Sequence, residues 1–127
     1  MPKDIYPTLQ YRDAREAIAW LERAFGFQPV HVYDDDTGKV VHAELRYGDG
    51  MIMVGSQAHN EETGAGGAPG GSRVYVVVED ADAHHEQAKA AGAEIVRELT
   101  DQEYGSRDYT ARDPDGNLWS FGTYRPE

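Results

Sequence analysis

The spacing of apolar positions predicts two amphipathic helices at equivalent places in the two halves of the chain. Over residues 13–25, apolar side chains recur every three or four positions, as they do along one face of a helix. These are Ala14, Ala17, Ile18, Leu21, Ala24 and Phe25. A second helix is predicted over residues 80–91. Each segment begins at an aspartate suited to the N-cap position, Asp13 or Asp80, and each is followed by a glycine that can end it.

Strand patterns surround both predicted helices with the same spacing. Gly26 and Gly92 each precede, by an equal interval, an Asp-Gly pair, and Asp-Gly is a common hairpin turn. The pairs lie at 49–50 and 115–116. A strand is predicted before each helix and another after each turn. These four segments are 5–10, 51–54, 73–78 and 118–121. Alternation along the last of them predicts that Trp119 and Phe121 face the core.

Each half therefore follows the order strand, helix, three strands. We expect one domain over residues 1–127, with module one at about 5–55, a glycine-rich linker at about 56–72 and module two at about 73–124. Because hairpins follow each helix, the predicted class is α+β. The expected architecture is a pair of βαβββ modules that form a cupped mixed sheet around a cleft, with the helices outside.

Composition narrows the classes of partner. The formal net charge is −11, from 23 acidic and 12 basic residues, which disfavours nucleic acid and anionic membranes as partners. The chain has no cysteine, so it can form neither disulfides nor thiolate zinc sites. It contains no apolar run of about 18 residues and no secretory signal pattern at its N-terminus, so we expect a cytoplasmic protein.

Several motifs resemble those of the vicinal-oxygen-chelate superfamily, which includes glyoxalase I, bleomycin-resistance proteins and extradiol dioxygenases. Residues 11–14, 17–21 and 24–27 are similar to the opening of these proteins, and residues 80–82 and 90–93 to their second helix. The most specific match is Arg112-Asp113-Pro114-Asp115-Gly116-Asn117-Leu118, which resembles their last turn and strand. The resemblance covers about residues 5 to 124 and implies paired modules around a ligand cleft.

In the metal-dependent members, each module supplies two metal ligands. The resemblance places these four positions at Tyr6, Glu44, Arg73 and Ser120. Only Glu44 is a residue type that commonly binds a divalent metal, which needs three or four nitrogen or carboxylate donors. We therefore expect no metal and no other cofactor.

Some polar and aromatic residues permit more than one interpretation. His42 shares a strand face with Glu44, so the pair could act as acid and base, hold a metal in an unfamiliar way, or simply form a hydrogen bond. Tyr6 and Tyr75 fall where the family lines its cleft, and either ligand stacking or core packing would explain them. Arg46 and Arg112 could clamp an anion or be solvated charges at strand ends. His84 and His85 are predicted to be solvent-exposed.

Two functions follow from these residues. The first is metal-independent binding of a small, aromatic or amphipathic molecule in the cleft, as in bleomycin-resistance-type sequestration. The residues expected to line that cleft are Tyr6, His42, Glu44, Arg73, Tyr75, Thr110 and Ser120. The alternative is a glyoxalase-like lyase or dioxygenase-type enzyme, with Glu44 as general base or metal ligand and His42 as its partner. Because unpaired sheet edges are usually covered, we also expect a homodimer.

Overall fold

The computed structural model of the chain describes residues 4–56 and 70–126. These residues divide into two compact units, one ending at Gly70 and the other beginning at Gly71. Most of the predicted linker lies outside the described residues. No helix in the described segments is both long enough and apolar enough to cross a membrane.

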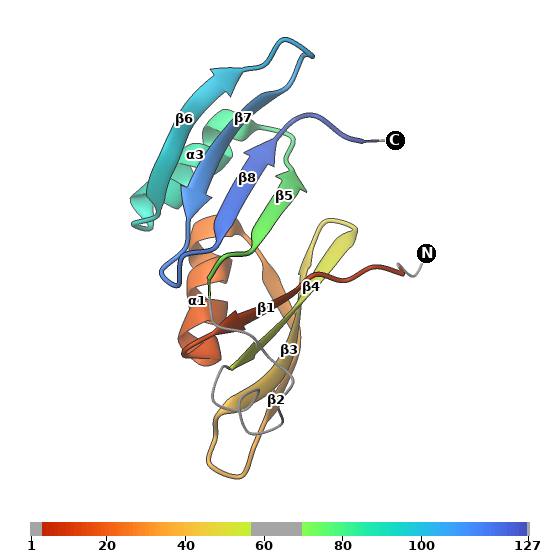
Figure 1. The fold of residues 1–127 in the computed structure, drawn as a ribbon, viewed down its shortest axis with the longest axis vertical. Helices are drawn as coiled ribbons and strands as arrows, with labels where there is room; N and C mark the ends of the chain where they lie inside the picture. The colour runs from red at the N-terminus through yellow and green to blue at the C-terminus, as the bar shows by residue number, and fades with distance from the viewer. Residues whose placement is uncertain (1–3, 57–69, 127) are drawn as a thin grey trace. The chain divides into compact units, whose positions relative to one another are not determined.

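The first unit has one helix and four strands (Figure 1). In chain order these are β1 (Thr8–Tyr11), α1 (Ala14–Phe25), β2 (Gln28–Asp34), β3 (Val40–Tyr47) and β4 (Gly50–Ser56). The strands form a mixed sheet in the order β1-β4-β3-β2. β1 pairs with β4 in parallel, whereas the β2–β3 and β3–β4 pairs are antiparallel.

The second unit repeats this plan. Its elements are β5 (Arg73–Val77), α3 (Ala81–Ala90), β6 (Glu94–Asp101), β7 (Arg107–Arg112) and β8 (Leu118–Gly122). The sheet order is β5-β8-β7-β6, again with one parallel pair, β5 and β8. The predicted α+β class and the paired βαβββ modules are therefore confirmed.

Both helices begin at the predicted aspartates. The Asp13 side chain accepts a hydrogen bond from the Glu16 amide at 3.3 Å, and the Asp80 side chain accepts one from the Ala83 amide at 3.0 Å. This interaction satisfies one of the backbone N–H groups that the first helical turn leaves without a partner. α1 ends at Gly26, whose φ of 85° is the left-handed conformation that glycine adopts readily.

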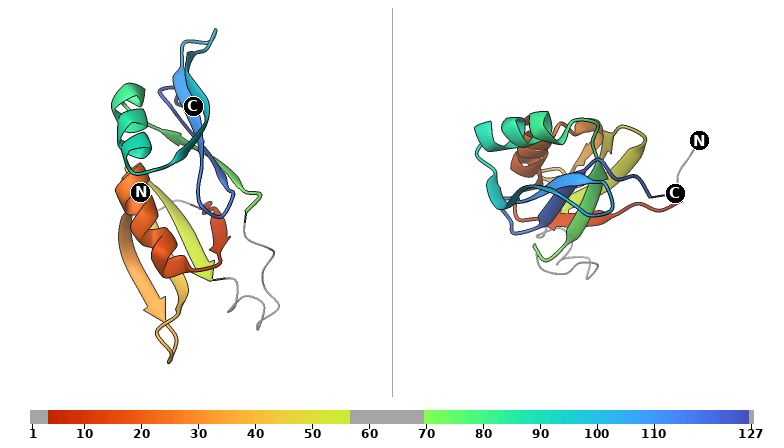
Figure 2. Two further views of the ribbon diagram at one scale, coloured as in Figure 1. Left: turned by 90° about the vertical axis from the view of Figure 1, so that its left-hand side faces the viewer. Right: turned by 90° about the horizontal axis from the view of Figure 1, so that it is seen from above.

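Each helix packs on one face of its own sheet (Figure 2). The strand residues on that face are buried and mostly apolar. They include Leu9, Tyr11, Ala43, Leu45, Val54, Tyr109, Ala111, Trp119 and Phe121. The core positions predicted for Trp119 and Phe121 are thus confirmed. We call the opposite face of each sheet its open face.

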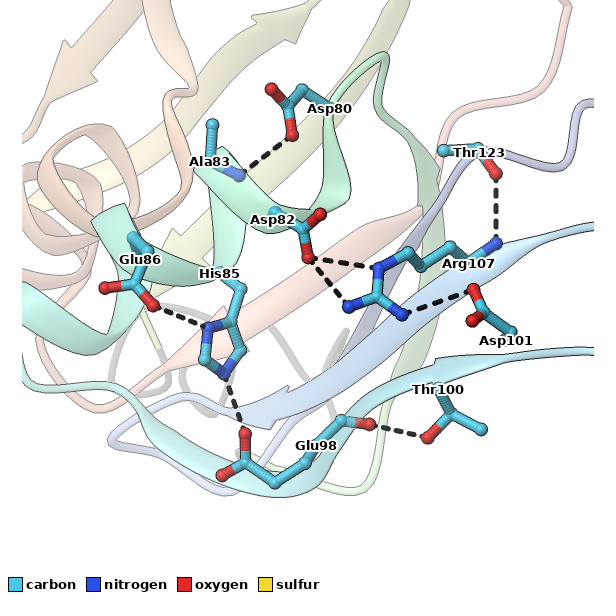
Figure 3. A network of polar contacts seen from close by, with 10 residues as sticks. All are labelled: Asp80, Asp82, Ala83, His85, Glu86, Glu98, Thr100, Asp101, Arg107 and Thr123. Atoms are coloured by element: carbon cyan, nitrogen blue, oxygen red, sulfur yellow. Dashed lines mark hydrogen bonds and ion pairs between the residues drawn. The ribbon is translucent and has the colours of Figure 1, made fainter.

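The prediction that His84 and His85 are exposed is wrong. Only 8% of His84 and 4% of His85 is exposed. The His84 ring lies 4.2 Å from that of Phe121, and its Nδ1 is 2.6 Å from the Tyr109 hydroxyl. His85 places Nε2 2.9 Å from a carboxylate oxygen of Glu98 (Figure 3). The other buried side chains of α3 are alanines, so the two imidazoles fill the space between helix and sheet.

Arg107 also connects α3 to the sheet on this side. Its guanidinium contacts the Asp82 carboxylate at 3.0 Å and the Asp101 carboxylate at 3.2 Å (Figure 3). Hydrogen bonds to these two acids raise the pKa of Arg107 above its usual value. These contacts lie on the helix-covered side of the second sheet, away from its open face.

The two hairpins differ in their loops. The predicted turn at residues 49–50 is displaced by one residue, because β4 already begins at Gly50 and the two-residue loop is Gly48–Asp49. Gly48 has a φ of 55°, and hairpin loops of two residues commonly need such a conformation. The second loop is longer, spans residues 113–117, and contains the predicted Asp115–Gly116 turn.

The outer strands β2 and β6 each contain a bulge at an equivalent position. The register of β2 against β3 shifts between Pro29 and His31, and that of β6 against β7 shifts between Ile95 and Arg97. The residues in between, Val30 and Val96, are exposed.

The homodimer that was expected from the unpaired sheet edges remains a prediction.

Candidate functional site

Each open face has four side chains in register across all four strands. We call them the first row and the second row. The first row is His31, Glu44, Met53 and Thr8, from β2, β3, β4 and β1. The second row is Arg97, Thr110, Ser120 and Tyr75, from β6, β7, β8 and β5. The two rows are equivalent by the internal repeat, but their chemistry differs.

One member of the first row, Glu44, belongs to a hydrogen-bonded pair of ionisable side chains. His42 Nε2 lies 3.1 Å from Glu44 Oε2, and the two side chains are 39% and 29% exposed. The Tyr33 ring stacks on His42 at a centroid distance of 5.9 Å and on His31 at 6.0 Å. The first unit thus presents stacked rings beside a half-exposed carboxylate that can accept hydrogen bonds.

Three members of the second row are connected by hydrogen bonds. Arg97 Nη2 donates to Thr110 Oγ1 at 3.2 Å, and Thr110 Oγ1 lies 2.8 Å from Ser120 Oγ. Arg97 Nη1 lies 2.7 Å from a carboxylate oxygen of Asp108, and the two side chains form an ion pair. The same carboxylate oxygen accepts a hydrogen bond from Gln102 at 3.1 Å.

Tyr75 occupies the far end of the second row. Its hydroxyl donates to the backbone oxygen of Tyr124 at 2.6 Å. Gly122 makes room for this hydroxyl, because a Cβ at that position would lie 2.8 Å from it. Burial raises the pKa of Tyr75, and the nearby acidic groups Asp108 and Tyr104 raise it further.

Tyr75 should therefore ionise above the ordinary tyrosine range. Subtracting the tyrosinate absorbance of Tyr75→Phe from that of wild type isolates this phenol among the eight tyrosines. We expect this absorbance difference to have its titration midpoint above about pH 10 in the native protein and near pH 10 in urea. A raised folded-state pKa means that the linked stability is present below the unfolded-state pKa and is lost as pH rises through the folded-state value. A native difference centred at the urea value would contradict this assignment.

The structure groups some predicted residues and separates others. His42 and Glu44 lie together in the first unit, as Thr110, Ser120 and Tyr75 do in the second. Tyr6, by contrast, precedes β1 and lies in no strand, so the prediction that it occupies a strand position is wrong. The strand begins after Pro7, which lacks an N–H group, although its carbonyl accepts a hydrogen bond from Met53 at 2.9 Å.

Arg73 also lies outside the second row. It starts β5 and is opposite Leu118, two residues before the Tyr75 position. Two other arginines lie at equivalent places on the open faces. Arg46 donates to Gln28 at 3.3 Å, and Arg112 forms an ion pair with Glu94 at 2.6 Å. Both arginines therefore contact neighbours on the outer strand of their own sheet.

Several residues of the two rows were not predicted from the sequence. They are His31, Met53 and Thr8 in the first row and Arg97 in the second, together with the neighbouring Tyr33 and Asp108. The internal repeat did indicate that His31 and Arg97 occupy equivalent positions, since they follow the equivalent glycines Gly26 and Gly92 by the same interval.

The residues of the two rows do not fit a metal site of the vicinal-oxygen-chelate type. The first row offers one imidazole and one carboxylate, beside a thioether and a hydroxyl. The second offers three hydroxyl groups and a guanidinium cation, which repels a metal ion. A divalent metal needs three or four nitrogen or carboxylate donors at close range. Within residues 4–56 and 70–126, no three histidine, aspartate or glutamate side chains are grouped to provide them.

The first unit also has a hollow of about 440 Å³ beside the start of α1. Charges of both signs line it, including Arg12, Asp13, Arg15, Glu16 and Lys39. Arg15 is held by Asp34 and by the carbonyl of Gly38. The residues that line this hollow include no member of the first row and none of the residues predicted to bind a ligand, so the hollow is separate from the first row.

Comparison with known proteins identifies the family. The model of the Glyoxalase/Bleomycin resistance protein/Dioxygenase superfamily matches residues 6–121. An uncharacterized protein of Mycobacterium bovis is 32% identical over 123 residues, which cover 91% of this chain and 80% of that protein. TioX from Micromonospora sp. ML1 has a crystal structure with 34% sequence identity and a TM-score of 0.84, covering 98% of this chain and 100% of that one.

A virulence protein from Salmonella typhimurium has the same fold at lower identity. Its structure shares 21% of residues, covers 98% of each chain and has a TM-score of 0.74. The family match covers most of the sequence, and it agrees with the repeated βαβββ units and the motif at residues 112–118. This chain therefore belongs to the glyoxalase/bleomycin resistance protein/dioxygenase superfamily.

Proposed function

We propose that this protein binds a small aromatic or amphipathic molecule on the open faces of its sheets, without a metal. The observation that carries this proposal is the half-exposed His42–Glu44 pair beside the stacked ring of Tyr33. Membership of a superfamily that includes bleomycin-resistance proteins supports it, because such proteins sequester small molecules. The biological role would then be binding rather than chemical conversion.

The arrangement of groups in the first unit suits such a ligand. Tyr33 and His42 provide ring surfaces on which a planar molecule can pack, and aromatic contacts of this kind are worth about 0.5–1.5 kcal/mol beyond the buried area. Glu44 supplies an acceptor at the edge of these rings. A carboxylate forms stronger hydrogen bonds than a neutral acceptor, so it would orient a ligand that carries an N–H or O–H group.

An enzymatic function is the second candidate, and the same hydrogen bond favours it. With His42 as its partner, Glu44 could remove a proton from a bound substrate as a general base. The candidate reactions are of the glyoxalase-like lyase or dioxygenase type. Turnover of a 2-oxoaldehyde–glutathione adduct, lost in Glu44→Gln, would favour catalysis over binding alone.

The proposed binding function predicts a large effect of Glu44→Gln. A thermal-shift screen of planar antibiotics and phenolic compounds would identify a ligand, and calorimetry would give its affinity. We expect Glu44→Gln to weaken binding about tenfold or more, because a hydrogen bond to a charged group contributes roughly 1.5–3 kcal/mol. The fold should change little, since glutamine retains the shape of the side chain.

Glu98→Gln is a matched control for this experiment. Glu98 also forms a hydrogen bond with a histidine, His85, but on the helix-covered side of the second sheet. We expect this variant to bind the ligand as tightly as the wild type. Equal affinity in Glu44→Gln and the wild type would show that Glu44 is not part of the site.

A further inference from the structure

We propose that the second row binds an anionic oxygen of the ligand, such as an aromatic carboxylate or phenolate, with Arg97 as the main contact. This inference rests on the proposed small-molecule function and specifies the chemical class of the ligand. It assigns a binding role to Arg97, which lies in register with Thr110, opposite the helix-covered face.

The bulge in β6 places Arg97 on the open face. Ile95 lies opposite Ala111, a buried residue of the helix-covered face, whereas Arg97 lies opposite Thr110. Strict alternation would put Ile95 and Arg97 on the same face, and the extra residue Val96 separates them. The guanidinium is then held in place by Thr110 and Asp108, as described above, and a pre-positioned side chain loses less conformational entropy when a ligand binds.

The two side chains of the Arg97–Asp108 ion pair differ in their exposure to solvent. The Arg97 side chain is 41% exposed, whereas that of Asp108 is only 5% exposed. A molecule that approaches the open face from solvent therefore meets the Arg97 side chain rather than the carboxylate, and within the guanidinium Nη1 is itself buried against Asp108. The carboxylate is covered and already engaged with Arg97 and Gln102.

The two hydroxyl groups of the row reinforce this preference for an acceptor. Thr110 Oγ1 accepts a hydrogen bond from Arg97, and Thr110 and Ser120 share one further hydrogen bond. Each hydroxyl carries one hydrogen, so one of the two hydrogens is left over whichever residue donates. No contact among the described residues uses that remaining hydrogen, so it can donate to a ligand oxygen beside the guanidinium.

The other end of the row suits an aromatic ring. Tyr75 is partly exposed there, and its hydroxyl hydrogen is already used by the backbone of Tyr124. Neighbouring strands lie about 4.8 Å apart, so a row across four strands spans about 14 Å. An aromatic acid can therefore reach from Arg97 toward the ring of Tyr75.

The experiment compares two probes of equal shape. One is 2-naphthoate, which carries the anionic group, and the other is its neutral analogue 2-naphthamide. Binding is followed by NMR titration of backbone amides, with the shifts of Thr110 and Ser120 as reporters of the second row. For wild type we expect naphthoate to shift these amides at millimolar or lower concentration, with an affinity above that of naphthamide.

Arg97→Gln should weaken naphthoate binding about tenfold and leave naphthamide within about twofold, since only the anion depends on the guanidinium. Arg112→Gln is the matched control. Arg112 lies on the same open face, is also 41% exposed and also forms an ion pair with a carboxylate, but it is not in the second row. We expect it to leave both affinities unchanged. The double variant Arg97→Gln/Asp108→Asn keeps the test valid if the single variant unfolds, because no buried carboxylate is left without its cation.

Three outcomes would overturn the inference. If naphthamide bound as tightly as naphthoate and both were insensitive to Arg97→Gln, the proposed aromatic binding would stand and the anion site would not. If naphthoate bound but shifted amides elsewhere, the second row would not be its site. If neither probe shifted any amide, both this inference and the proposed function would be contradicted for aromatic ligands of this size.

Discussion

Replacing Asp113 with alanine is expected to lower the free energy of unfolding by about 3–5 kcal/mol, because this buried carboxylate joins the β7–β8 loop to the core. One carboxylate oxygen accepts hydrogen bonds from the amides of Asp115 and Asn117, each at 3.0 Å. The other accepts from the Asn117 side chain at 3.1 Å and from the Trp119 indole at 3.0 Å. Alanine would leave all four donors without this acceptor.

Urea unfolding of the wild type and three variants, Asp113→Ala among them, would test this. Asp113→Asn keeps the shape but turns one oxygen into a donor facing the donors of Asn117 and Trp119, so we expect roughly half or more of the full loss. Asp36→Ala, in the exposed β2–β3 turn, is the control and should stay within about 0.5 kcal/mol of wild type. A loss below about 1 kcal/mol for Asp113→Ala would contradict the structural role assigned to this carboxylate.

Gly122→Ala is expected to destabilise the second unit by about 2–3 kcal/mol through steric overlap on the open face. A Cβ at this position would lie 2.7 Å from Cβ of Asp108 and 3.1 Å from Oγ of Ser106. The Asp108 Cβ is attached directly to the backbone of β7, so it cannot move without shifting the strand. The Tyr75 hydroxyl, 2.8 Å from the added Cβ, would also have to move.

Gly50→Ala provides a control at another strand glycine. A Cβ there would meet only the Tyr47 carbonyl oxygen at 3.5 Å, an ordinary van der Waals distance. We expect its stability to match that of wild type or to rise by about 0.5 kcal/mol, because alanine restricts the unfolded chain more than glycine does. Similar stabilities for the two alanine variants would rule out the close packing around Gly122.

The motif at residues 112–118 illustrates how sequence and structure complement each other. The sequence identified it as a family turn that precedes the last strand. The structure adds the reason that its polar residues occur together. Asp113 holds the loop and the Trp119 indole, while the Asn117 side chain accepts a hydrogen bond from the amide of Ser72 at 3.2 Å, next to β5.

The errors in the sequence-based predictions arise where long-range contacts override local patterns. His84 and His85 have polar side chains on a helix with few large apolar residues, and both are buried against rings of strands distant in the sequence, His84 against Tyr109 and Phe121 and His85 against Tyr109. Similarly, the strand predicted to include Tyr6 begins only after Pro7, where β1 takes up its parallel pairing with β4.

The sequence by itself determined the repeated strand–helix–strand order, the helix starts at Asp13 and Asp80, and the core-facing alternation of the last strand. These features depend on interactions within a few residues, such as an N-cap bond or a side-chain period, which a local pattern can encode. The tertiary structure alone decided which residues of the outer strands β2 and β6 lie on the open faces. The bulges at Val30 and Val96 reverse the alternation beyond them, so His31 joins Glu44, and Arg97 joins Thr110 and Ser120. A bulge is fixed by pairing with a neighbouring strand far along the chain, and that pairing leaves no periodic pattern in the sequence of the strand itself.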